Sequence, residues 1–337
     1  MKIMFRVSAD ARVGLGHLRR CLSLAQALRP HATCKFLLAG DEAAQRYLQQ
    51  FSFETELASI ADEHEATLTY CAREDINLIV ADSYALTASN LQQFTSAGAK
   101  VVVVDDVADR ELLVDVVING SVGAERLGYR VAATTELLLG PRYAILRPEF
   151  AEPPTRVIRE SIENVLITVG GSDPHQLSPR LVAWTRAALG DVALNVVVGP
   201  LFSTDVIDQL KTLGVALHYD PPAMRDLMLQ ADVALCSGGQ TTYELAATGT
   251  PAMAIMTAEN QNLNLASFSK AGALLSFSTY NELDLYHKTL HAIATLAQNY
   301  FLRKEMSSRA RELIDGYGVQ RISAKILECI YETPLTC

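Results

Sequence analysis

The stretch MKIMFRVSADARVGLGHLRRCLSLAQAL, residues 1–28, decides the fold class of this chain. Its beginning, MKIMFRV, is an apolar run with the length of one strand. A short loop with Gly14 and Gly16 follows, and LRRCLSLAQAL then repeats apolar residues at helical spacing. A strand that leads through a glycine-bearing loop into a helix is the first unit of a doubly wound sheet, so we predict an α/β protein.

The same rhythm continues along the chain. Apolar runs rich in Val and Ile alternate with amphipathic stretches, which is typical of βα units around parallel sheets buried on both faces. In the first half, strands are expected at residues 2–8, 34–39, 78–83, 100–105, 114–119 and 136–140. In the second half, strands are expected at residues 164–170, 194–199, 215–219, 233–239 and 252–257. We therefore predict two doubly wound, Rossmann-like domains.

The boundary between these domains is expected in RPEFAEPPTRVIRES, where three prolines and several charges separate two strands. We place it near residue 155, which gives domains of residues 1–155 and 156–337. The tail, 281–331, has the pattern of consecutive helices, and a terminal helix is expected to cross back over the hinge. Both halves open with a strand and a glycine loop, so we expect them to face each other across a cleft at the carboxyl ends of their strands.

Composition excludes several classes of protein. With 337 residues, 49% hydrophobic and 20% charged, the chain is too apolar to be disordered. A net charge of -9 without a dense Lys/Arg run argues against nucleic acid as a partner. The longest apolar runs, such as VALNVVVG (192–199), are far shorter than the roughly 18 residues of a membrane span.

Cysteine usage and the absence of ligand motifs define the remaining expectations. The six cysteines show no CxxC spacing, and the chain starts with a strand instead of a signal peptide, so we expect a cytosolic protein with free thiols. No Asp-x-Asp motif and no His/Cys cluster is present, so neither a metal nor a cofactor is predicted.

The histidine of GLGH is the first candidate for chemistry. Arg19 stands where the dinucleotide fingerprint needs a small residue, so a nicotinamide or flavin site is disfavoured. The loop instead brings His17 to a helix N-terminus, where the helix dipole disfavours the imidazolium and favours a neutral ring that accepts a proton. His17 is therefore either a general base or a residue that caps its helix or packs on the loop.

A second candidate is ITVGGSDPHQLS, residues 167–178. Gly170 and Gly171 allow a close approach of the backbone to a ligand, and Ser172 and Asp173 are expected to cap a helix that starts at Pro174. Free amides at that helix start suit a phosphate. The alternative is an ordinary turn from strand to helix.

The third stretch, ALCSGGQTTYELAATGTPAMAIMTAENQNLN (234–264), is the most specific. Ser237, Gly238 and Gly239 follow a strand and open a helix, so their amides, with the hydroxyls of Ser237 and Thr241, suit a pyrophosphate. Glu244 lies about one turn further, where a carboxylate can bind ribose hydroxyls.

Other polar residues follow predicted strands. We expect the cluster Glu259, Asn260 and Gln261 to face a ligand. Asp105 and Asp106 would touch the sugar, support the first loop or, as we favour, cap the strand end. Arg142, Tyr143 and Arg147 would contact a phosphate or, as we favour, form the hinge between the domains. We interpret His175 as solvated and not as catalytic.

Several stretches carry a resemblance to known families. SGGQTTYELAATGTPAMAI with the downstream ENQ resembles the donor-binding signature of the GT-B superfamily, in particular the N-acetylglucosaminyltransferases that synthesise lipid II. Five further stretches resemble the nucleotide-sugar hydrolase of pseudaminic acid biosynthesis and its spore-coat polysaccharide relatives: FRVSADARVGLGHLRRCLSLAQAL, VADSYALT, VVVVDDVADRELLVDVVING, LLLGPRYAILRPEF and ITVGGSDPHQLS. The resemblance covers roughly residues 2–265.

This resemblance implies a GT-B-like hydrolase of UDP-2,4-diacetamido-2,4,6-trideoxy-β-L-altropyranose. Water would attack the anomeric carbon with inversion, releasing the free sugar and UDP. By position, the family's catalytic histidine, tyrosine and asparagine fall on His17, Tyr84 and Asn260. The residues expected to bind the UDP-sugar are Asp10, Gly14, Gly16, Gly170, Gly171, Ser172, Ser237, Gly238, Gly239, Thr241, Glu244 and Gln261.

Two other functions use the same residues. A GT-B glycosyltransferase would use the same donor site and the same His17, but with an acceptor hydroxyl in place of water. A non-catalytic nucleotide-sugar sensor would keep the binding loops, and His17 would then have no role in chemistry.

Overall fold

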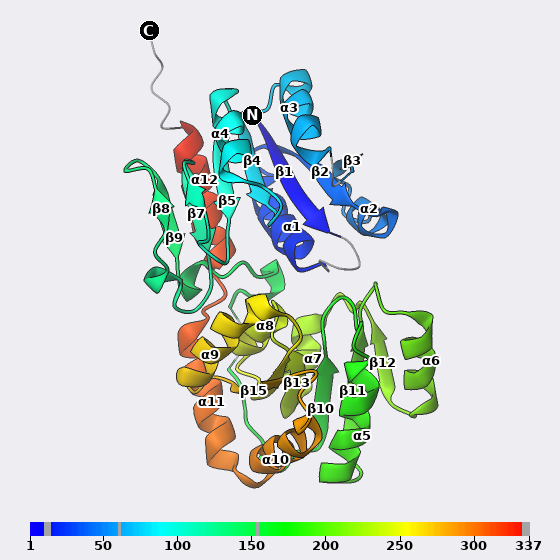
Figure 1. Ribbon diagram of the computed structural model, residues 1–337. Coiled ribbons are helices and arrows are strands. Elements are labelled where there is room, and N and C mark those ends of the chain that lie inside the picture. Colours follow the sequence, from blue (N-terminus) through cyan, green and yellow to red (C-terminus); the bar gives the residue numbers. More distant parts are fainter. Residues whose placement is uncertain (10–14, 60–61, 153–154, 332–337) are drawn as a thin grey trace. The chain divides into compact units, whose positions relative to one another are not determined.

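The computed structural model describes residues 1–9, 15–59, 62–152 and 155–331, and the chain forms two compact units (Figure 1). The first unit consists of Met1–Pro148 together with Tyr317–Cys337, and the second of Glu149–Gly316. The division thus lies between Pro148 and Glu149, slightly before residue 155. The last helix, α12 (Gly318–Tyr331), is part of the first unit, whereas the sequence analysis counts it within residues 156–337.

The first unit is built on a seven-stranded parallel sheet with the order β3-β2-β1-β4-β5-β7-β9. Its strands are β1 (Lys2–Ala9), β2 (Thr33–Gly40), β3 (Glu54–Ala58), β4 (Leu78–Asp82), β5 (Lys100–Val104), β7 (Val116–Asn119) and β9 (Glu136–Leu139). A separate pair, β6 (Glu111–Leu112) and β8 (Arg130–Val131), lies beside it. The sequence analysis missed β3, because this half-exposed edge strand, ETELA, has no apolar run.

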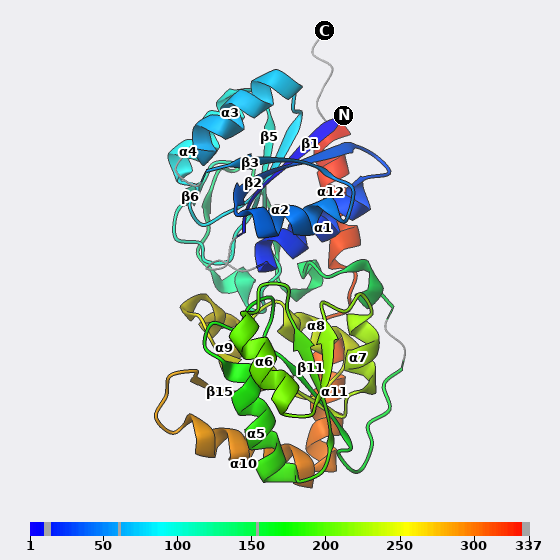
Figure 2. The same ribbon diagram turned by 90° about the vertical axis from the view of Figure 1, so that its right-hand side faces the viewer.

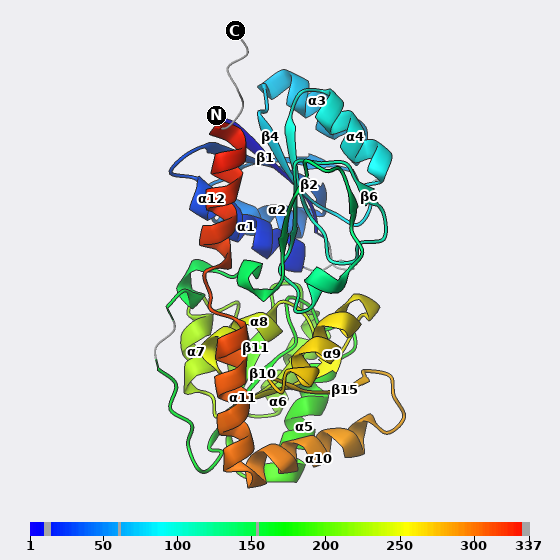
Figure 3. The ribbon, with the colours of Figure 1, turned by 90° about the vertical axis from the view of Figure 1, so that its left-hand side faces the viewer.

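Helices cover the sheet of the first unit. They are α1 (Gly16–Leu28), α2 (Glu42–Gln49), α3 (Glu63–Glu74), α4 (Ala88–Ser96) and α12, with short 3-10 turns η1 (Ala124–Arg126), η2 (Pro141–Tyr143) and η3 (Pro148–Phe150). Helix α1 packs on β1 and β4, and α12 packs against α1 (Figure 3). The N-terminus of α1 is thereby held beside the carboxyl ends of the central strands.

The second unit contains a six-stranded parallel sheet with the order β12-β11-β10-β13-β14-β15. Its strands are β10 (Asn164–Thr168), β11 (Ala193–Val198), β12 (Ala216–Tyr219), β13 (Val233–Ser237), β14 (Ala252–Met256) and β15 (Leu275–Thr279). The sequence analysis missed the edge strand β15, because LSFST alternates apolar residues with serines instead of forming a Val/Ile run.

Helices pack on both faces of this second sheet (Figure 2). They are α5 (Leu177–Leu189), α6 (Thr204–Thr212), α7 (Met224–Gln230), α8 (Thr241–Thr248), α9 (Asn262–Lys270), α10 (Leu285–Gln298) and α11 (Tyr300–Leu313), with the 3-10 turn η4 (Glu259–Gln261). Helix α5 packs against α6 and α10, and α8 packs against α7 and α11. The α/β prediction is confirmed.

In each sheet the strand order reverses beside the first strand, between β1 and β4 and between β10 and β13. Helices on opposite faces diverge at such a point, which leaves the carboxyl ends of the strands accessible to a ligand. His17 and Asp82 lie at the first reversal, and Val169 and Ser237 lie at the second. The topology thus singles out one position in each unit.

Two further properties concern the described part of the chain. None of the helices in these ranges combines the length and the hydropathy that a membrane span requires. The cysteines Cys21, Cys34, Cys71, Cys236 and Cys329 are free thiols.

A buried arginine connects three segments of the second unit: α11, the end of α10 and the segment before β10. Arg303 of α11 is fully buried, and its guanidinium donates to four backbone carbonyls. Two belong to Leu296 and Ala297 at the end of α10, and two belong to Arg159 and Glu160 in the segment before β10. The helix end therefore has charge-assisted partners for carbonyls that would otherwise be unpaired.

Replacing Arg303 by Met is expected to lower the free energy of unfolding by about 2–4 kcal/mol, because buried carbonyls lose charged donors. Urea denaturation followed by circular dichroism measures this loss. The matched control is Arg309→Met on the same helix, whose exposed pair with Glu305 should contribute at most about 0.5 kcal/mol. Equal losses in both variants would contradict the assigned role of Arg303.

Candidate active site

His17 is the second residue of α1, and its imidazole bonds to a carboxylate on the neighbouring strand. The side chain is buried, with 8% of the residue exposed, and Nδ1 lies 2.5 Å from Oδ1 of Asp82, the last residue of β4. The helix begins after Leu15 without a side-chain cap, so His17 does not cap its own helix. The loop does bring the histidine to a helix N-terminus, as predicted.

Arg20, one turn further along α1, joins two carboxylates. Its Nε and Nη2 donate to the two oxygens of Asp82 at 2.5 and 2.7 Å. Its Nη1 and Nη2 donate to the two oxygens of Asp106, which follows β5, both at 2.9 Å. The guanidinium therefore makes a bidentate contact on each of two edges, which fixes its plane and position.

Tyr84 completes the cluster around His17. Its hydroxyl donates to Oδ2 of Asp106 at 2.8 Å, and its ring meets the imidazole edge to face, with the centroids 4.8 Å apart and an interplanar angle of 88°. The side chain is partly open to solvent, with 43% of the residue exposed. The structure thus places the two residues together that the family resemblance implied as catalytic within this unit.

The sequence analysis missed Asp82 and Arg20 and misjudged Asp106. Asp105 does cap the strand end, because its carboxylate accepts from the amides of Val107 and Ala108. Asp106 instead pairs with Arg20, so the interpretation of Asp106 as a cap is wrong. A signal was present: Asp82 and Asp106 follow neighbouring buried strands, whose carboxyl ends lie side by side in a parallel sheet.

The charges of this cluster determine which atom carries the proton on His17. Burial alone would raise the pKa of Asp82, but the charge of Arg20 and the contact with His17 outweigh it, so the pKa lies well below its usual range. Asp82 is therefore ionised and only accepts hydrogen bonds, which assigns a hydrogen to Nδ1 of His17. The other nitrogen, Nε2, has no hydrogen-bond partner within residues 1–9, 15–59, 62–152 and 155–331, and it is the atom available to accept a proton.

Burial and ion pairing also oppose each other in their effects on the pKa values of Asp106 and Arg20. Burial would raise the pKa of Asp106 and lower that of Arg20, but in each case the ion pairs prevail, so the pKa of Asp106 is lowered and that of Arg20 is raised. The helix dipole disfavours an imidazolium at position 17, whereas the ionised Asp82 stabilises one. His17 therefore has a partner for the charge it acquires when it accepts a proton.

In the second unit, the loop after β10 differs from the prediction. Helix α5 begins at Leu177 and not at Pro174, and the carboxylate of Asp173 accepts from the amides of Leu177 and Ser178 at 2.7 and 2.8 Å. The residue before the helix is Gln176, so Ser172 is not its cap. Because Asp173 occupies these two amides, the start of α5 is not a free anion site.

The two glycine loops of this unit lie against each other. Oγ of Ser237, the last residue of β13, donates to the carbonyl of Val169 at 2.9 Å. Gly170 has a φ of +100°, which favours glycine, and an added Cβ there would lie 3.8 Å from the same Oγ. The predicted residues Gly170 and Ser237, from segments far apart in the sequence, are thus neighbours.

Two amide side chains of the next segment support the loop before α8. Asn264 of α9 is buried, and its Nδ2 donates to the carbonyl of Gly238 at 3.2 Å and to Oγ1 of Thr242 at 3.0 Å. A Cβ on Gly238 would lie 3.0 Å from Oε1 of Gln261 and 2.6 Å from Cδ1 of Leu265, so only glycine fits there without displacement. The Asn264 amide thus fixes the orientation of the Gly238 carbonyl, while the Gln261 amide bonds to Thr257.

Asn264 is a residue that the sequence analysis did not select. It follows Gln261 by three positions, which puts both on the same side of a helical segment, and this spacing was the available signal. Its Oδ1 is buried and has no hydrogen-bond partner among the residues that the structure describes.

The remaining predicted residues occupy varied positions. Gly16 is the first residue of α1, Thr241 and Glu244 lie in the first turn of α8, and Asn260 is an exposed residue of η4. Gly171 approaches β11 closely, because a Cβ on Gly199 would lie 2.4 Å from its carbonyl oxygen. Asp10 and Gly14 lie outside the described residues.

The residues interpreted as structural differ among themselves. Arg142 and Tyr143 form η2 of the first unit, where Arg321 of α12 donates to the carbonyl of Arg142 at 2.8 Å. Arg147 is followed by Pro148, the last residue before the division between the units, and the hinge role remains a prediction. His175 is not simply solvated, because its ring stacks on that of Tyr280 with centroids 3.5 Å apart.

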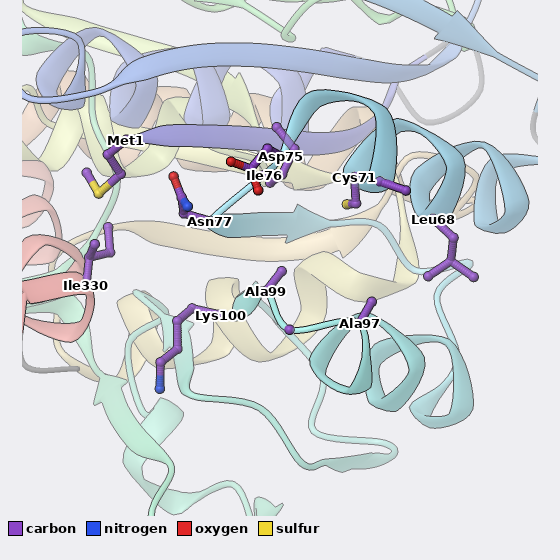
Figure 4. A pocket seen from close by; sticks show the side chains of 12 residues that line it. Met1, Leu68, Cys71, Asp75, Ile76, Asn77, Ala97, Ala99, Lys100 and Ile330 are labelled. Carbon is purple, nitrogen blue, oxygen red and sulfur yellow. The ribbon is translucent and has the colours of Figure 1, made fainter. Parts of the chain in front are cut away.

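A cavity of about 730 Å³ lies elsewhere in the first unit (Figure 4). Met1, Asn77 and Lys100 line it, which places it at the amino ends of β1, β4 and β5, opposite to His17 and Asp82. Its lining contains no histidine, and Lys100 is paired with Asp115. The cavity is separate from the His17 cluster. No group of three or more potential metal ligands is found in the described ranges.

Comparison with known proteins finds a relative that is similar over nearly the full length of the chain. No family model matches the chain. It is 27% identical over 327 residues to the spore coat polysaccharide biosynthesis protein SpsG of Bacillus subtilis, with 95% of both chains covered. The chain is thus a homologue of SpsG, in agreement with the spore-coat part of the predicted resemblance.

Solved structures match the fold at low sequence identity. MurG of Acinetobacter baumannii has a TM-score of 0.66 at 16% identity, covering 97% of this chain and 99% of that one. A putative UDP-N-acetylglucosamine 2-epimerase of Listeria monocytogenes has a TM-score of 0.68 at 13% identity, covering 99% and 97%. The spinosyn rhamnosyltransferase SpnG, in complex with thymidine diphosphate, has a TM-score of 0.67 at 16% identity, covering 97% and 100%. The predicted GT-B-like α/β fold is therefore confirmed.

Proposed function

We propose that the protein hydrolyses a UDP-linked 2,4-diacetamido-2,4,6-trideoxyhexose to the free sugar and UDP with inversion, for nonulosonic (pseudaminic-type) acid or surface polysaccharide biosynthesis. The observation that carries this proposal is the His17–Asp82 pair at the carboxyl end of β4. A buried carboxylate on Nδ1 leaves Nε2 as a proton acceptor, which is the arrangement of a general base. The homology to a polysaccharide biosynthesis protein supports the pathway class.

In the proposed reaction, His17 activates water. Nε2 takes a proton from the water as its oxygen bonds to the anomeric carbon, on the face opposite to the nucleotide. The bond from that carbon to the phosphate oxygen breaks, and its electron pair leaves with UDP. Asp82 stabilises the imidazolium that forms, and Tyr84, held by Asp106, is assigned to orient the water or an acetamido group, together with Asn260.

The nucleotide is assigned to the loops of the second unit. Developing negative charge on the pyrophosphate needs amide donors that are not already used. The amides of Leu177 and Ser178 at the start of α5 bond to Asp173, and the amides of Thr242 and Tyr243 in α8 bond to the carbonyls of Gly239 and Gln240. We therefore place the pyrophosphate at the loop before α8, at the amides of Gly238 and Gly239. Glu244, in the first turn of α8, is assigned to the ribose.

A glycosyltransferase is the second candidate. The structural likeness to MurG and to a rhamnosyltransferase favours it, and the same base would then deprotonate an acceptor hydroxyl. A sensor without catalysis would bind UDP-sugar but would not depend on His17.

The first experiment is incubation of the protein with the UDP-2,4-diacetamido-2,4,6-trideoxy sugar, without acceptor or added metal. NMR should detect release of UDP and a free sugar of inverted anomeric configuration. His17→Asn should lower kcat by about 10²–10⁴-fold, because the general base is lost, and should leave KM nearly unchanged. The control His31→Asn changes an exposed histidine of the same unit and should keep wild-type activity.

Each other outcome of this experiment selects an alternative. Tight binding of UDP without turnover rejects the hydrolase for this substrate. Turnover that requires an added acceptor identifies a transferase. Unchanged turnover in His17→Asn contradicts the role of His17 as the base.

Asn264 should matter for nucleotide binding although it is buried beneath the loop. Asn264→Ala removes the donor that orients the Gly238 peptide, so the Kd for UDP should rise by about 10-fold, as expected for one lost hydrogen bond to a binding loop. Isothermal titration calorimetry measures this change. The matched control is Asn262→Ala, an exposed residue of the same helix, with an affinity within about twofold of the wild type. Equal affinity of Asn264→Ala and the wild type would show that the loop needs no such support.

A further inference from the structure

Arg20 binds two carboxylates at the same time. It pairs with both oxygens of Asp82 on one edge and both oxygens of Asp106 on another, and its Nη2 also lies 3.2 Å from Nδ1 of His17. Its side chain is 12% exposed. A lysine has one charged nitrogen and cannot reproduce two planar forks. The site therefore depends on the shape of this group as well as on its charge.

Among the residues that the structure describes, the charges around His17 come from few groups. Arg20 faces it from α1, Asp82 from the end of β4, and Asp106 and Tyr84 from the segments after β5 and β4.

Behind Asp82, Cys21 of α1 contacts its carboxylate. The buried Arg6 of β1 also acts on Asp82, but its ion pair with Glu63 leaves that pair without net charge. Burial keeps Cys21 protonated, because it raises the pKa of the thiol well above its usual value.

The charges of these groups nearly cancel one another. With a neutral His17, two carboxylates and one guanidinium leave one net negative charge beside the imidazole. A proton on His17 cancels that charge. Without Arg20 two negative charges would remain, and without the charge of Asp106 none would remain.

We infer that Arg20 and Asp106 are positioning residues that set how firmly His17 holds a proton: Arg20 weakens the hold and aligns Asp82, and Asp106 strengthens the hold and aligns Arg20 and Tyr84. This inference rests on the proposed role of His17 as general base. Such a base must be free of its proton when it meets water and must retain the proton once the water has attacked. Without Arg20, the two unbalanced carboxylates would keep His17 protonated. Without the charge of Asp106, the neutral cluster would make His17 a weaker base. The intact cluster, with one excess negative charge, lies between these two cases.

The position of Tyr84 depends on the same ion pairs. Its hydroxyl bonds to the carboxylate that holds Arg20, so the base and the tyrosine are fixed by one network of hydrogen bonds. Displacing Arg20 is therefore expected to disorder both side chains, whereas Tyr84→Phe removes the hydroxyl that bonds to Asp106 and removes no charge.

The test is the titration of the His17 ring by NMR, with the resonance assigned by its absence in His17→Asn. In Arg20→Met the titration midpoint should rise by about one pH unit or more, because a positive charge is lost close to the ring. In Asp106→Asn the midpoint should fall by a similar amount, because a negative charge is lost. The controls Tyr84→Phe and Arg46→Met, which alters an exposed ion pair on α2, should leave it within about 0.3 pH unit.

Arg20→Lys separates charge from shape. It keeps the positive charge, so the midpoint should stay near that of the wild type, while kcat should fall by about 10-fold or more because Asp82 and Tyr84 lose their alignment. Asp106→Asn nearly preserves the shape of the side chain and carries the charge test on its own if Arg20→Met does not fold.

Opposite shifts of the midpoint in Arg20→Met and Asp106→Asn support the inference, and shifts in the same direction or no shifts overturn it. The titration needs no turnover. Failure of the protein to release UDP would contradict the proposed function, whereas absent or parallel shifts would contradict the assignment of Arg20 and Asp106. Where turnover is present, the acidic limb of the pH profile of kcat/KM should move in the same direction as the midpoint.

Discussion

The buried carboxylate of Asp82 is the constraint on which the first unit's candidate site depends. It ends a central strand and is fully buried, and an ionised group in that position is tolerated only when it is paired and hydrogen-bonded. Arg20 and His17, one turn apart on α1, supply the partners. The same bonds that stabilise the carboxylate set the rotation of α1 on the sheet and the tautomer of the histidine.

The second unit uses a different principle, in which backbone and amide groups replace charges. Gly170 and Ser237 meet where the strand order reverses, and Asn264 and Gln261 support the glycines before α8. Two helices begin in this region, and they are not equivalent. Helix α5 is capped by the carboxylate of Asp173, whereas α8 begins after Gln240 without a side-chain cap, and the anion site that we propose lies in the glycine loop before α8.

The arrangement around His17 suits hydrolysis and glycosyl transfer alike, because water and an acceptor hydroxyl need the same base. Homology to SpsG and a fold shared with MurG and a putative UDP-N-acetylglucosamine 2-epimerase support the proposed nucleotide-sugar chemistry in either form. The deciding property is what occupies the position opposite to the leaving group. That choice depends on a bound acceptor more than on the base itself.

The sequence by itself determined the α/β class, most strands and the two glycine loops, because apolar runs and glycines report local structure directly. Its predicted site residues His17 and Tyr84 came together in the first unit, and Gly170 and Ser237 in the second. Only the tertiary structure decided the partners. Asp82, Arg20 and Asp106 come from three segments whose proximity follows from strand order. Long-range pairing of this kind leaves no periodic signal in the chain, so residues that act through it are recognised once the fold brings them together.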